Sequence, residues 1–301
     1  FICSGKFLLG GIAKRNAEIF DIFYDIQVLF DYIKTSGKES PFYKPIFEGL
    51  KEVRNLYLYE DPQAYSKAKA ITKPLLAIPS ANSFRTTCVG HAHLDLIWLW
   101  PLRESYRKEI RTISNAVYLL DTYPAFTYVC SQPQQVEWLK EKAPSLFAKF
   151  KHYVELGRVE LVGGSWVESD TNLIGEEAFM RQMLYGQKFW KENFGHYTEV
   201  MWLPDTFGYN GNIPQILRES GQKYFVTTKI SWNQYNVFPY HSFIWEGIDG
   251  SKVLAHMPPD NTYNSYALPN TLIKMEKNSP EKVIYPAAVM SYGIVDGGGG
   301  P

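Results

Sequence analysis

The sequence predicts an α/β protein in which a helical leading segment precedes a parallel sheet, open or barrel-like. Two observations predict this class. From about residue 18 to residue 73, apolar residues recur at the spacing of amphipathic helices. After residue 83, short β-prone runs alternate with charged amphipathic stretches, an order typical of parallel sheets covered by helices.

The leading segment, residues 1–82, is expected to form a helical N-terminal region. Its apolar residues form two faces, namely Ile19, Ile22, Phe23, Ile26, Leu29 and Phe30, and then Ile46, Leu50, Val53, Leu56 and Tyr57. The run Pro-Ser-Ala-Asn-Ser at 79–83 is typical of a linker, because these residues favour turns and loops.

The second region, residues 83–301, is expected to hold the sheet. The predicted strands are 86–90, 126–130, 160–163, 200–203, 224–228, 243–245, 253–256 and 289–292. The helices predicted between them are 104–120, 134–156, 175–194 and 213–220. In such sheets the catalytic residues lie where strands end and loops begin, at the carboxyl edge.

Composition excludes several classes of function. The 31 basic residues balance the 31 acidic ones, so no positive field is expected to gather nucleic acid or an anionic membrane. No apolar run is long enough to cross a bilayer. The three cysteines are odd in number and widely spaced, which fits a reducing compartment such as the cytosol. The sequence leaves the oligomeric state open, a homo-oligomer included.

The first chemical motif is Gly-His-Ala-His-Leu-Asp at 90–95, directly after the first predicted strand. An imidazole and a carboxylate two positions apart, at His93 and Asp95, offer nitrogen and oxygen to one metal ion. The alternative is a histidine that closes the strand end and pairs with Asp95. Trp98 and Trp100 follow, and each indole is suited either to stack on a sugar ring or to pack in the core.

The second motif is Trp-Leu-Pro-Asp-Thr-Phe-Gly-Tyr at 202–209, an apolar strand that ends in Pro-Asp. Asp205 is expected to point into the same carboxyl-edge cleft, although an aspartate after proline also commonly caps a helix.

The third motif is Asp296 followed by four glycines and a proline. Glycines let the backbone approach a ligand closely, and a flexible turn is the alternative. A phosphate loop is rejected, because no Gly-Lys-Ser/Thr is present and no helix follows. Glu168 and Asp170, at another predicted strand end, are suited to a second shell around a metal, to binding sugar hydroxyls, or to capping the next helix.

Together these motifs resemble glycoside hydrolase family 38, the class II α-mannosidases, and especially its cytosolic and vacuolar branch. The similarity runs from about residue 83 to 301. It also includes Gly-Gly-Ser-Trp-Val-Glu-Ser-Asp at 163–170 and Thr-Thr-Lys-Ile-Ser-Trp at 227–232. The resemblance implies a seven-stranded (β/α) barrel-like catalytic domain, of which this chain, expected to be a fragment of a longer protein, holds the N-terminal part.

The resemblance also implies roles for individual residues. His93, Asp95 and Asp205 would bind one divalent ion, zinc or alternatively cobalt, with a further histidine ligand beyond this chain. Asp205 would also be the nucleophile, Trp98 and Phe207 would shape the mannose subsite, and Lys229 would neutralise charge near Asp205.

The expected activity is therefore retaining hydrolysis of terminal α-linked mannose from oligomannose glycans, through a covalent glycosyl-enzyme intermediate. Such enzymes use two carboxyl groups about 5 Å apart, for which Asp205 is the nucleophile and Asp296 the acid/base. The alternatives are a metal-dependent carbohydrate deacetylase and a non-catalytic sugar-binding fragment. The expected location is cytoplasmic, with a vacuole or lysosome as the alternative.

Overall fold

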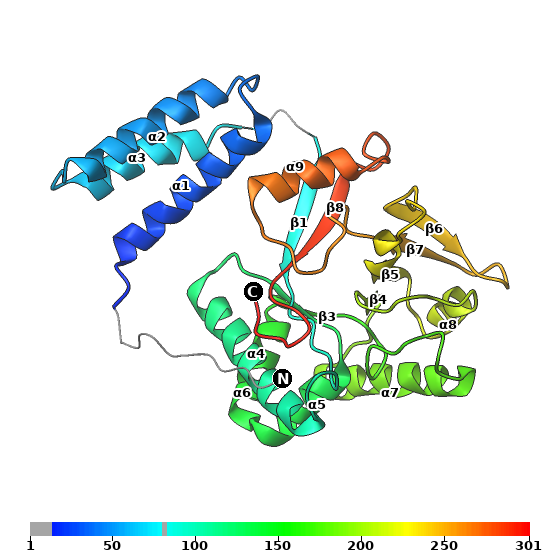
Figure 1. Cartoon of the computed structure of the whole chain (residues 1–301). Coiled ribbons are helices and arrows are strands. Elements are labelled where there is room, and N and C mark those ends of the chain that lie inside the picture. Colours follow the sequence, from blue (N-terminus) through cyan, green and yellow to red (C-terminus); the bar gives the residue numbers. More distant parts are fainter. Residues whose placement is uncertain (1–13, 80–82) are drawn as a thin grey trace. The chain divides into compact units, whose positions relative to one another are not determined.

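The computed structural model describes residues 14–79 and 83–301, which form two compact units (Figure 1). The first unit holds three helices together with Leu268–Asn270, and the second holds the strands and the remaining helices. Residues 80–82 of the predicted linker lie outside the described residues, as does Cys3.

The first unit is made of helices α1 (Ala17–Ser36), α2 (Tyr43–Leu58) and α3 (Ala64–Leu76). The side chain of Asn16 caps α1 by accepting a hydrogen bond from the backbone N–H of Ile19 (3.1 Å). The apolar spacing read from the sequence forms the core of this unit, whose buried residues are Ile22, Leu29, Ile33, Ile46, Val53 and Ala68. The leading segment is therefore helical, as the sequence predicts.

The second unit contains two four-stranded sheets. The first has the order β3-β2-β1-β8, all parallel, and consists of β1 (Arg85–Gly90), β2 (Tyr128–Cys130), β3 (Val159–Leu161) and β8 (Ala287–Tyr292). The second has the order β4-β5-β7-β6 and consists of β4 (Val200–Leu203), β5 (Tyr224–Thr227), β6 (Ser242–Glu246) and β7 (Lys252–His256). In this second sheet β6 runs antiparallel to β7, so the prediction of a parallel sheet is wrong at this strand.

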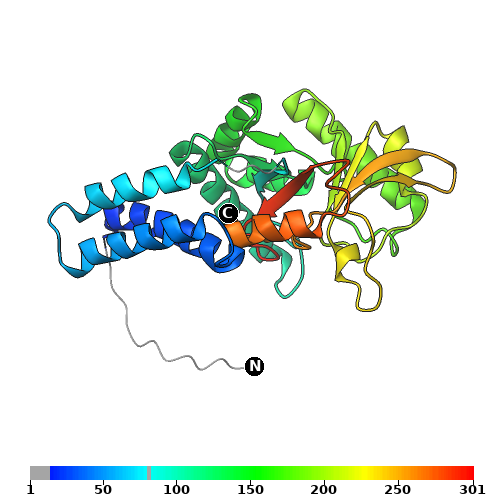
Figure 2. The same ribbon diagram turned by 90° about the horizontal axis from the view of Figure 1, so that it is seen from above.

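Helices separate most of these strands along the chain (Figures 1 and 2). They are α4 (Leu102–Thr122), α5 (Pro133–Lys142), α6 (Pro144–Glu155), α7 (Glu176–Phe194), α8 (Ile213–Glu219) and α9 (Pro269–Asn278). The single helix predicted over 134–156 is wrong, because it is divided into α5 and α6 at Ala143, whose φ is −141°. The proline at 144 disfavours the helical conformation of the residue before it. Helix α9 was not predicted.

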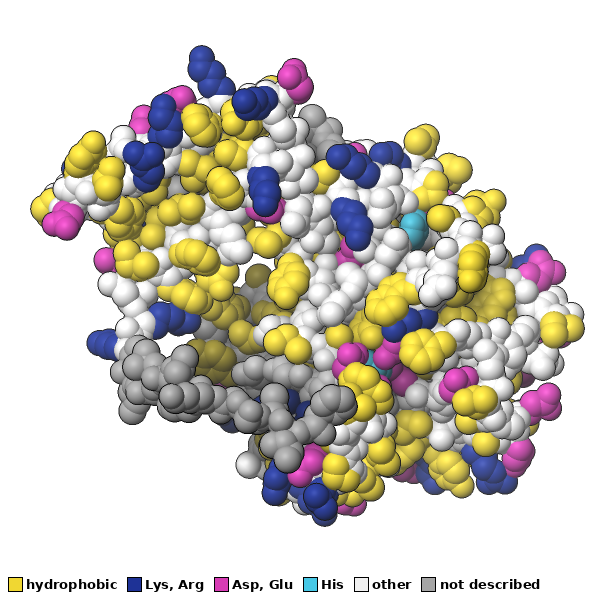
Figure 3. Space-filling view, viewed as in Figure 1, with side chains coloured by type: hydrophobic (Ala, Val, Ile, Leu, Met, Phe, Trp, Pro, Cys, Tyr) yellow, Lys and Arg dark blue, Asp and Glu magenta, His cyan; other side chains and the backbone are white. Residues whose placement is uncertain are grey.

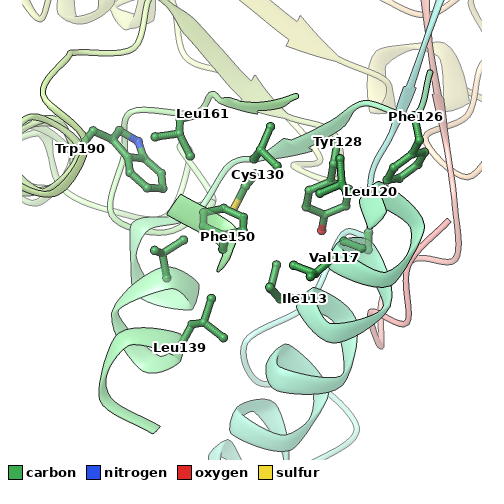
Figure 4. Packing of buried hydrophobic residues seen from close by; sticks show 14 of the residues in the cluster. Ile113, Val117, Leu120, Phe126, Tyr128, Cys130, Leu139, Phe150, Leu161 and Trp190 are labelled. Carbon is green, nitrogen blue, oxygen red and sulfur yellow. The ribbon is translucent and has the colours of Figure 1, made fainter. Parts of the chain in front are cut away.

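The largest apolar core packs the first sheet against α4, α5, α6 and α7. Figure 4 shows side chains of β2 and β3 facing those of the helices, and the labelled residues are Ile113, Val117, Leu120, Phe126, Tyr128, Cys130, Leu139, Phe150, Leu161 and Trp190. A smaller cluster of Val129, Val162, Trp202 and Val226 joins side chains from both sheets. This packing makes the strand ends rigid supports for the loops that follow them.

Candidate metal and catalytic centre

Polar side chains converge from the loops that follow the carboxyl ends of five strands. All five loops contribute side chains to the same cluster. These are His93 and Asp95 after β1, Glu168 after β3, Asp205 after β4, Lys229 after β5, and Asp296 after β8. The registers Gly90↔Tyr292 and Leu203↔Thr227 pair the last residues of adjacent strands, so neighbouring loops begin at the same level. These loops lie at the carboxyl edge, where catalytic residues are expected in such sheets.

Backbone hydrogen bonds fix the first and last of these loops to each other. The N–H of Asp95 donates to the carbonyl of Asp296 (2.9 Å), and the N–H of Gly298 donates to the carbonyl of His93 (3.3 Å). Gly293 has φ +142°, and a Cβ there would lie 2.0 Å from the carbonyl oxygen of His91, so only glycine fits. Asp296 itself has φ +62°, a conformation that aspartate tolerates better than most residues.

Four side chains in this cluster could each offer a ligand atom to one metal ion. His93, Asp95, Asp205 and Asp296 each offer one ligand atom, and these atoms lie within 4.8 Å of one another. Nε2 of His93 is 3.3 Å from Oδ1 of Asp95 and 3.4 Å from Oδ2 of Asp205. A tetrahedral site with bonds of about 2.0–2.1 Å places neighbouring ligand atoms ~3.3 Å apart. One imidazole nitrogen and carboxylate oxygens at these separations therefore fit a divalent ion.

The charges in the cluster reinforce this arrangement. Burial lowers the pKa of His93, but the charge of Glu168 and the hydrogen bonds of Asp205 and Asp95 outweigh burial and raise the pKa well above 6.5. Partial burial raises the pKa of Asp205, yet hydrogen bonds from His93 and Lys229 outweigh it and the pKa is lowered. Asp205 is therefore ionised at neutral pH, and an ion bound at Nε2 would replace a proton of His93.

Lys229 is held in place by aromatic rings as well as by Asp205. Its Nζ lies 2.5 Å from Oδ1 of Asp205 and 3.6 Å from the ring centroid of Trp232. The rings of Phe207 and Tyr263 are 4.9 and 5.3 Å from the same nitrogen. On the face drawn in Figure 3, acidic side chains gather around a histidine and are bordered by hydrophobic side chains.

Of the two aromatic residues predicted for the sugar site, Phe207 lies at the cluster, whereas Trp98 packs against another tryptophan. Phe207 is 78% exposed and lies beside Lys229, so the structure brings it to the cluster. Trp98 is 55% exposed, and its ring packs edge-on against Trp100 with 5.8 Å between centroids. Within the described residues, the ring of Trp98 packs on no aromatic ring of the cluster.

The geometry also decides between the alternatives left open by the motifs. Asp205 does not cap a helix, because the next α-helix, α8, begins at Ile213 and has Asn212 at its N-cap. His91 is buried against Trp202, and burial followed by the charge of His93 lowers its pKa to about 3. His91 is thus a neutral core residue, and His93 is the histidine that faces the carboxylates.

Tyr263 joins the cluster although no sequence motif predicted a role for it. Its hydroxyl donates to Oδ1 of Asp296 (3.3 Å), and its ring lies edge-on to that of His93. Burial, followed by the charges of Asp205 and Asp296, raises the pKa of Tyr263, so the hydroxyl keeps its proton. Its place in the loop after β7, at the carboxyl end of a parallel strand, was the signal that could have identified it.

Known proteins share sequence with the region that holds this cluster. Residues 83–301 match the model of the glycosyl hydrolases family 38 N-terminal domain, and they include every residue of the cluster. The chain belongs to glycosyl hydrolase family 38.

Relatives of this family 38 chain are named as mannosidases. It is 38% identical to alpha-mannosidase G of Dictyostelium discoideum and 37% identical to alpha-mannosidase 2C1 of Mus musculus, over 96% of this chain in each case. It spans only 27% and 28% of the lengths of those proteins.

A solved structure has a similar fold. It is that of an alpha-mannosidase from Enterococcus faecalis V583, with a TM-score of 0.60 at 20% identity, covering 73% of this chain and 26% of that one. Within the described part of this family 38 chain, no helix combines the length and apolarity needed to cross a membrane.

Proposed function

We propose that this chain is the metal-binding part of a retaining α-mannosidase catalytic domain, with Asp205 as nucleophile and Asp296 as acid/base. One observation carries the proposal: ligand atoms of Asp205 and Asp296 lie within 4.8 Å of each other, beside His93 and Asp95. Retaining glycosidases keep their two carboxyl groups about 5–5.5 Å apart, whereas inverting enzymes need roughly 6.5 Å or more to admit a water molecule. The family membership and the names of the relatives support the substrate class.

The fold proposal is a seven-stranded barrel made of β1–β5, β7 and β8, in residues 83–301, preceded by the helical region 1–82. The N–H of Gly163, after β3, donates to the carbonyl of Val200 in β4 (2.7 Å), which supports continuity between the two sheets. The chain would supply the N-terminal part of this domain, in keeping with the family model that it matches.

The two oxygens of Asp205 have different partners, and this supports a division of roles. Oδ2 faces Nε2 of His93 and belongs to the metal-binding set, while Oδ1 is paired with Lys229. We assign attack on the anomeric carbon to Oδ1. Lys229 keeps this oxygen ionised and oriented until the sugar arrives.

The reaction then proceeds in two balanced steps. In the first, Oδ1 of Asp205 bonds to the anomeric carbon, the glycosidic C–O bond breaks, and the proton of Asp296 moves to the leaving oxygen. In the second, Asp296 takes a proton from water, the water oxygen bonds to the anomeric carbon, and the bond to Asp205 breaks. The Tyr263 hydroxyl holds Asp296 in position through both steps.

A divalent ion held by His93, Asp95 and Asp205 would supply a Lewis acid that binds the vicinal hydroxyls of a terminal mannose. The donor set fits zinc, with cobalt as the alternative. The substrate would be an oligomannose glycan, with Phe207 and Trp98 offering apolar faces to sugar rings. A cytoplasmic location stays a prediction.

The proposal is tested by trapping the covalent intermediate. The zinc-loaded chain is incubated with a fluorinated mannosyl fluoride, which transfers its sugar readily and is released slowly. Asp205 is expected to displace the anomeric fluoride, so mass spectrometry should find one fluoromannosyl group on Asp205, and Asp205→Asn is expected to abolish it. Asp249→Asn, in the turn before β7, is the matched control and is expected to label like the wild type.

Two outcomes would contradict the proposal. Labelling on a different residue would exclude Asp205 as the nucleophile. A wild-type chain that binds zinc but is never labelled would exclude covalent catalysis by this chain.

A further inference from the structure

The imidazole of His93 is held at both of its nitrogens. Nε2 faces Asp95 and Asp205, as described above, and Nδ1 lies 2.9 Å from Oε2 of Glu168. The side chains of His93 and Glu168 are 4% and 6% exposed. The two atoms are in ion-pair contact, and within residues 14–79 and 83–301 neither Nδ1 nor Oε2 has a hydrogen-bond partner. Each atom is therefore the polar neighbour that compensates for burial of the other.

Glu168 is itself fixed by the loop after β2. The hydroxyl of Ser131 donates to Oε1 of Glu168 (2.6 Å), which leaves Oε2 for His93. The backbone N–H of Glu168 donates to Oε1 of Gln132 (3.1 Å), and Nε2 of Gln132 donates to the carbonyl of Leu94 (3.2 Å). The buried Gln132 amide thus ties the backbone of Glu168 to the residue next to His93.

The segment that carries Glu168 is also anchored from outside the cluster. The N–H of Trp166 donates to the carbonyl of Gln182 in α7 (2.9 Å), and the N–H of Val167 donates to the side-chain oxygen of the same residue (3.0 Å). The indole N–H of Trp166 donates to Gln134 in α5 (3.0 Å). Two helices therefore fix the height of Glu168 relative to the strand ends.

We infer that Glu168 is a positioning residue that accepts the Nδ1–H of His93 and so directs the Nε2 lone pair toward the metal, with Ser131 holding the carboxylate in place. This inference rests on the proposed function, because it assigns a partner to the proposed metal ligand. A carboxylate behind a metal-binding imidazole fixes its tautomer and ring orientation and increases its basicity. Loss of such a partner typically weakens metal binding about 10–100-fold.

The same contacts argue against a sugar-binding role for Glu168. Its carboxylate is almost fully buried, and both oxygens are occupied by Ser131 and His93. Contact with a sugar hydroxyl would leave the Nδ1 of His93 buried without a partner, which is unfavourable. Glu168 therefore acts through His93.

The test measures metal affinity, not turnover. Zinc binding to the wild type, Glu168→Gln, Ser131→Ala and Glu177→Gln is measured by competition with a chelating dye. Cobalt absorption spectra report the geometry of the ligands, and thermal unfolding of the metal-free proteins reports the fold. Glu177 is an exposed residue of α7 paired with Arg181, so Glu177→Gln is the matched control.

Glu168→Gln is expected to weaken zinc binding at least tenfold and to change the cobalt spectrum, while Glu177→Gln changes neither. Ser131→Ala is expected to weaken zinc binding severalfold with the fold retained. If Glu168→Gln does not fold, unchanged zinc affinity in Ser131→Ala would overturn the inference. Zinc affinity within twofold of the wild type in a folded Glu168→Gln would overturn the inference and leave the proposed metal site intact. A wild-type chain that binds no zinc would overturn both.

Discussion

Glu109 is a carboxylate buried in the core that supports the candidate site. It lies on the face of α4 that packs on the first sheet, and it is 1% exposed. Its Oε1 has no hydrogen-bond partner among the described residues. Burial raises the pKa of this carboxyl from 4.5 to about 8.

This raised pKa makes the stability of the second unit depend on pH. The folded chain keeps the Glu109 proton at pH values where the unfolded chain has released it. The contribution of this proton to the free energy of unfolding is therefore fully present below pH 4.5, and it is lost as the pH rises from 4.5 to about 8. The full difference corresponds to ~5 kcal/mol. Between pH 5 and pH 9 the loss is ~4 kcal/mol.

Glu109→Gln removes the titrating proton at nearly constant volume. The wild type is therefore expected to lose ~4 kcal/mol of unfolding free energy relative to the variant as pH rises from 5 to 9. Urea unfolding followed by tryptophan fluorescence measures this difference, because all eight tryptophans lie between Trp98 and Trp245, in the second unit.

An exposed glutamate provides the control for Glu109. Glu177→Gln makes the same chemical change on the surface of α7 and is expected to follow the wild type at every pH. If the free-energy difference between the wild type and Glu109→Gln stays constant within ~0.5 kcal/mol from pH 5 to 9, the argument from burial is refuted.

Two further predictions concern the site and the segment beneath it. Lys229→Met removes a cation 2.5 Å from Asp205, so the pKa of Asp205 is expected to rise. The acid limb of the pH profile for mannosyl labelling should then move up by about one pH unit. Gly186→Ala would place a Cβ 2.2 Å from the carbonyl oxygen of Gly164, which should cost ~1–3 kcal/mol in urea unfolding.

A specific result would contradict each of the predictions for Lys229→Met and Gly186→Ala. An unchanged acid limb in Lys229→Met would show that this lysine does not set the ionisation of Asp205. For Gly186 the calibration is Ala178→Gly, at an exposed position of α7, which should cost only the helix propensity of ~1 kcal/mol. A gain of that size in Gly186→Ala would show that the helix has room for the methyl group.

The alternation of strands and helices was predictable because it depends on local patterns. The predicted helix 213–220 and strand 200–203 agree closely with α8 and β4. The break between α5 and α6 had a local cause, the proline at 144, which the apolar spacing of the surrounding residues concealed. The antiparallel direction of β6 depends on its pairing with β7, which no local pattern records.

The sequence by itself determined the family, the metal-binding motif and the order in which its residues occur. His93, Asp95 and Asp205 follow apolar strands, and chemistry at strand ends is readable from spacing. Only the tertiary structure brought Asp296 within 4.8 Å of them, gave His93 its partner Glu168, and added Tyr263. The physical reason is that these contacts join residues from 33 to 203 positions apart in the chain, and strand pairing and core packing set their distances.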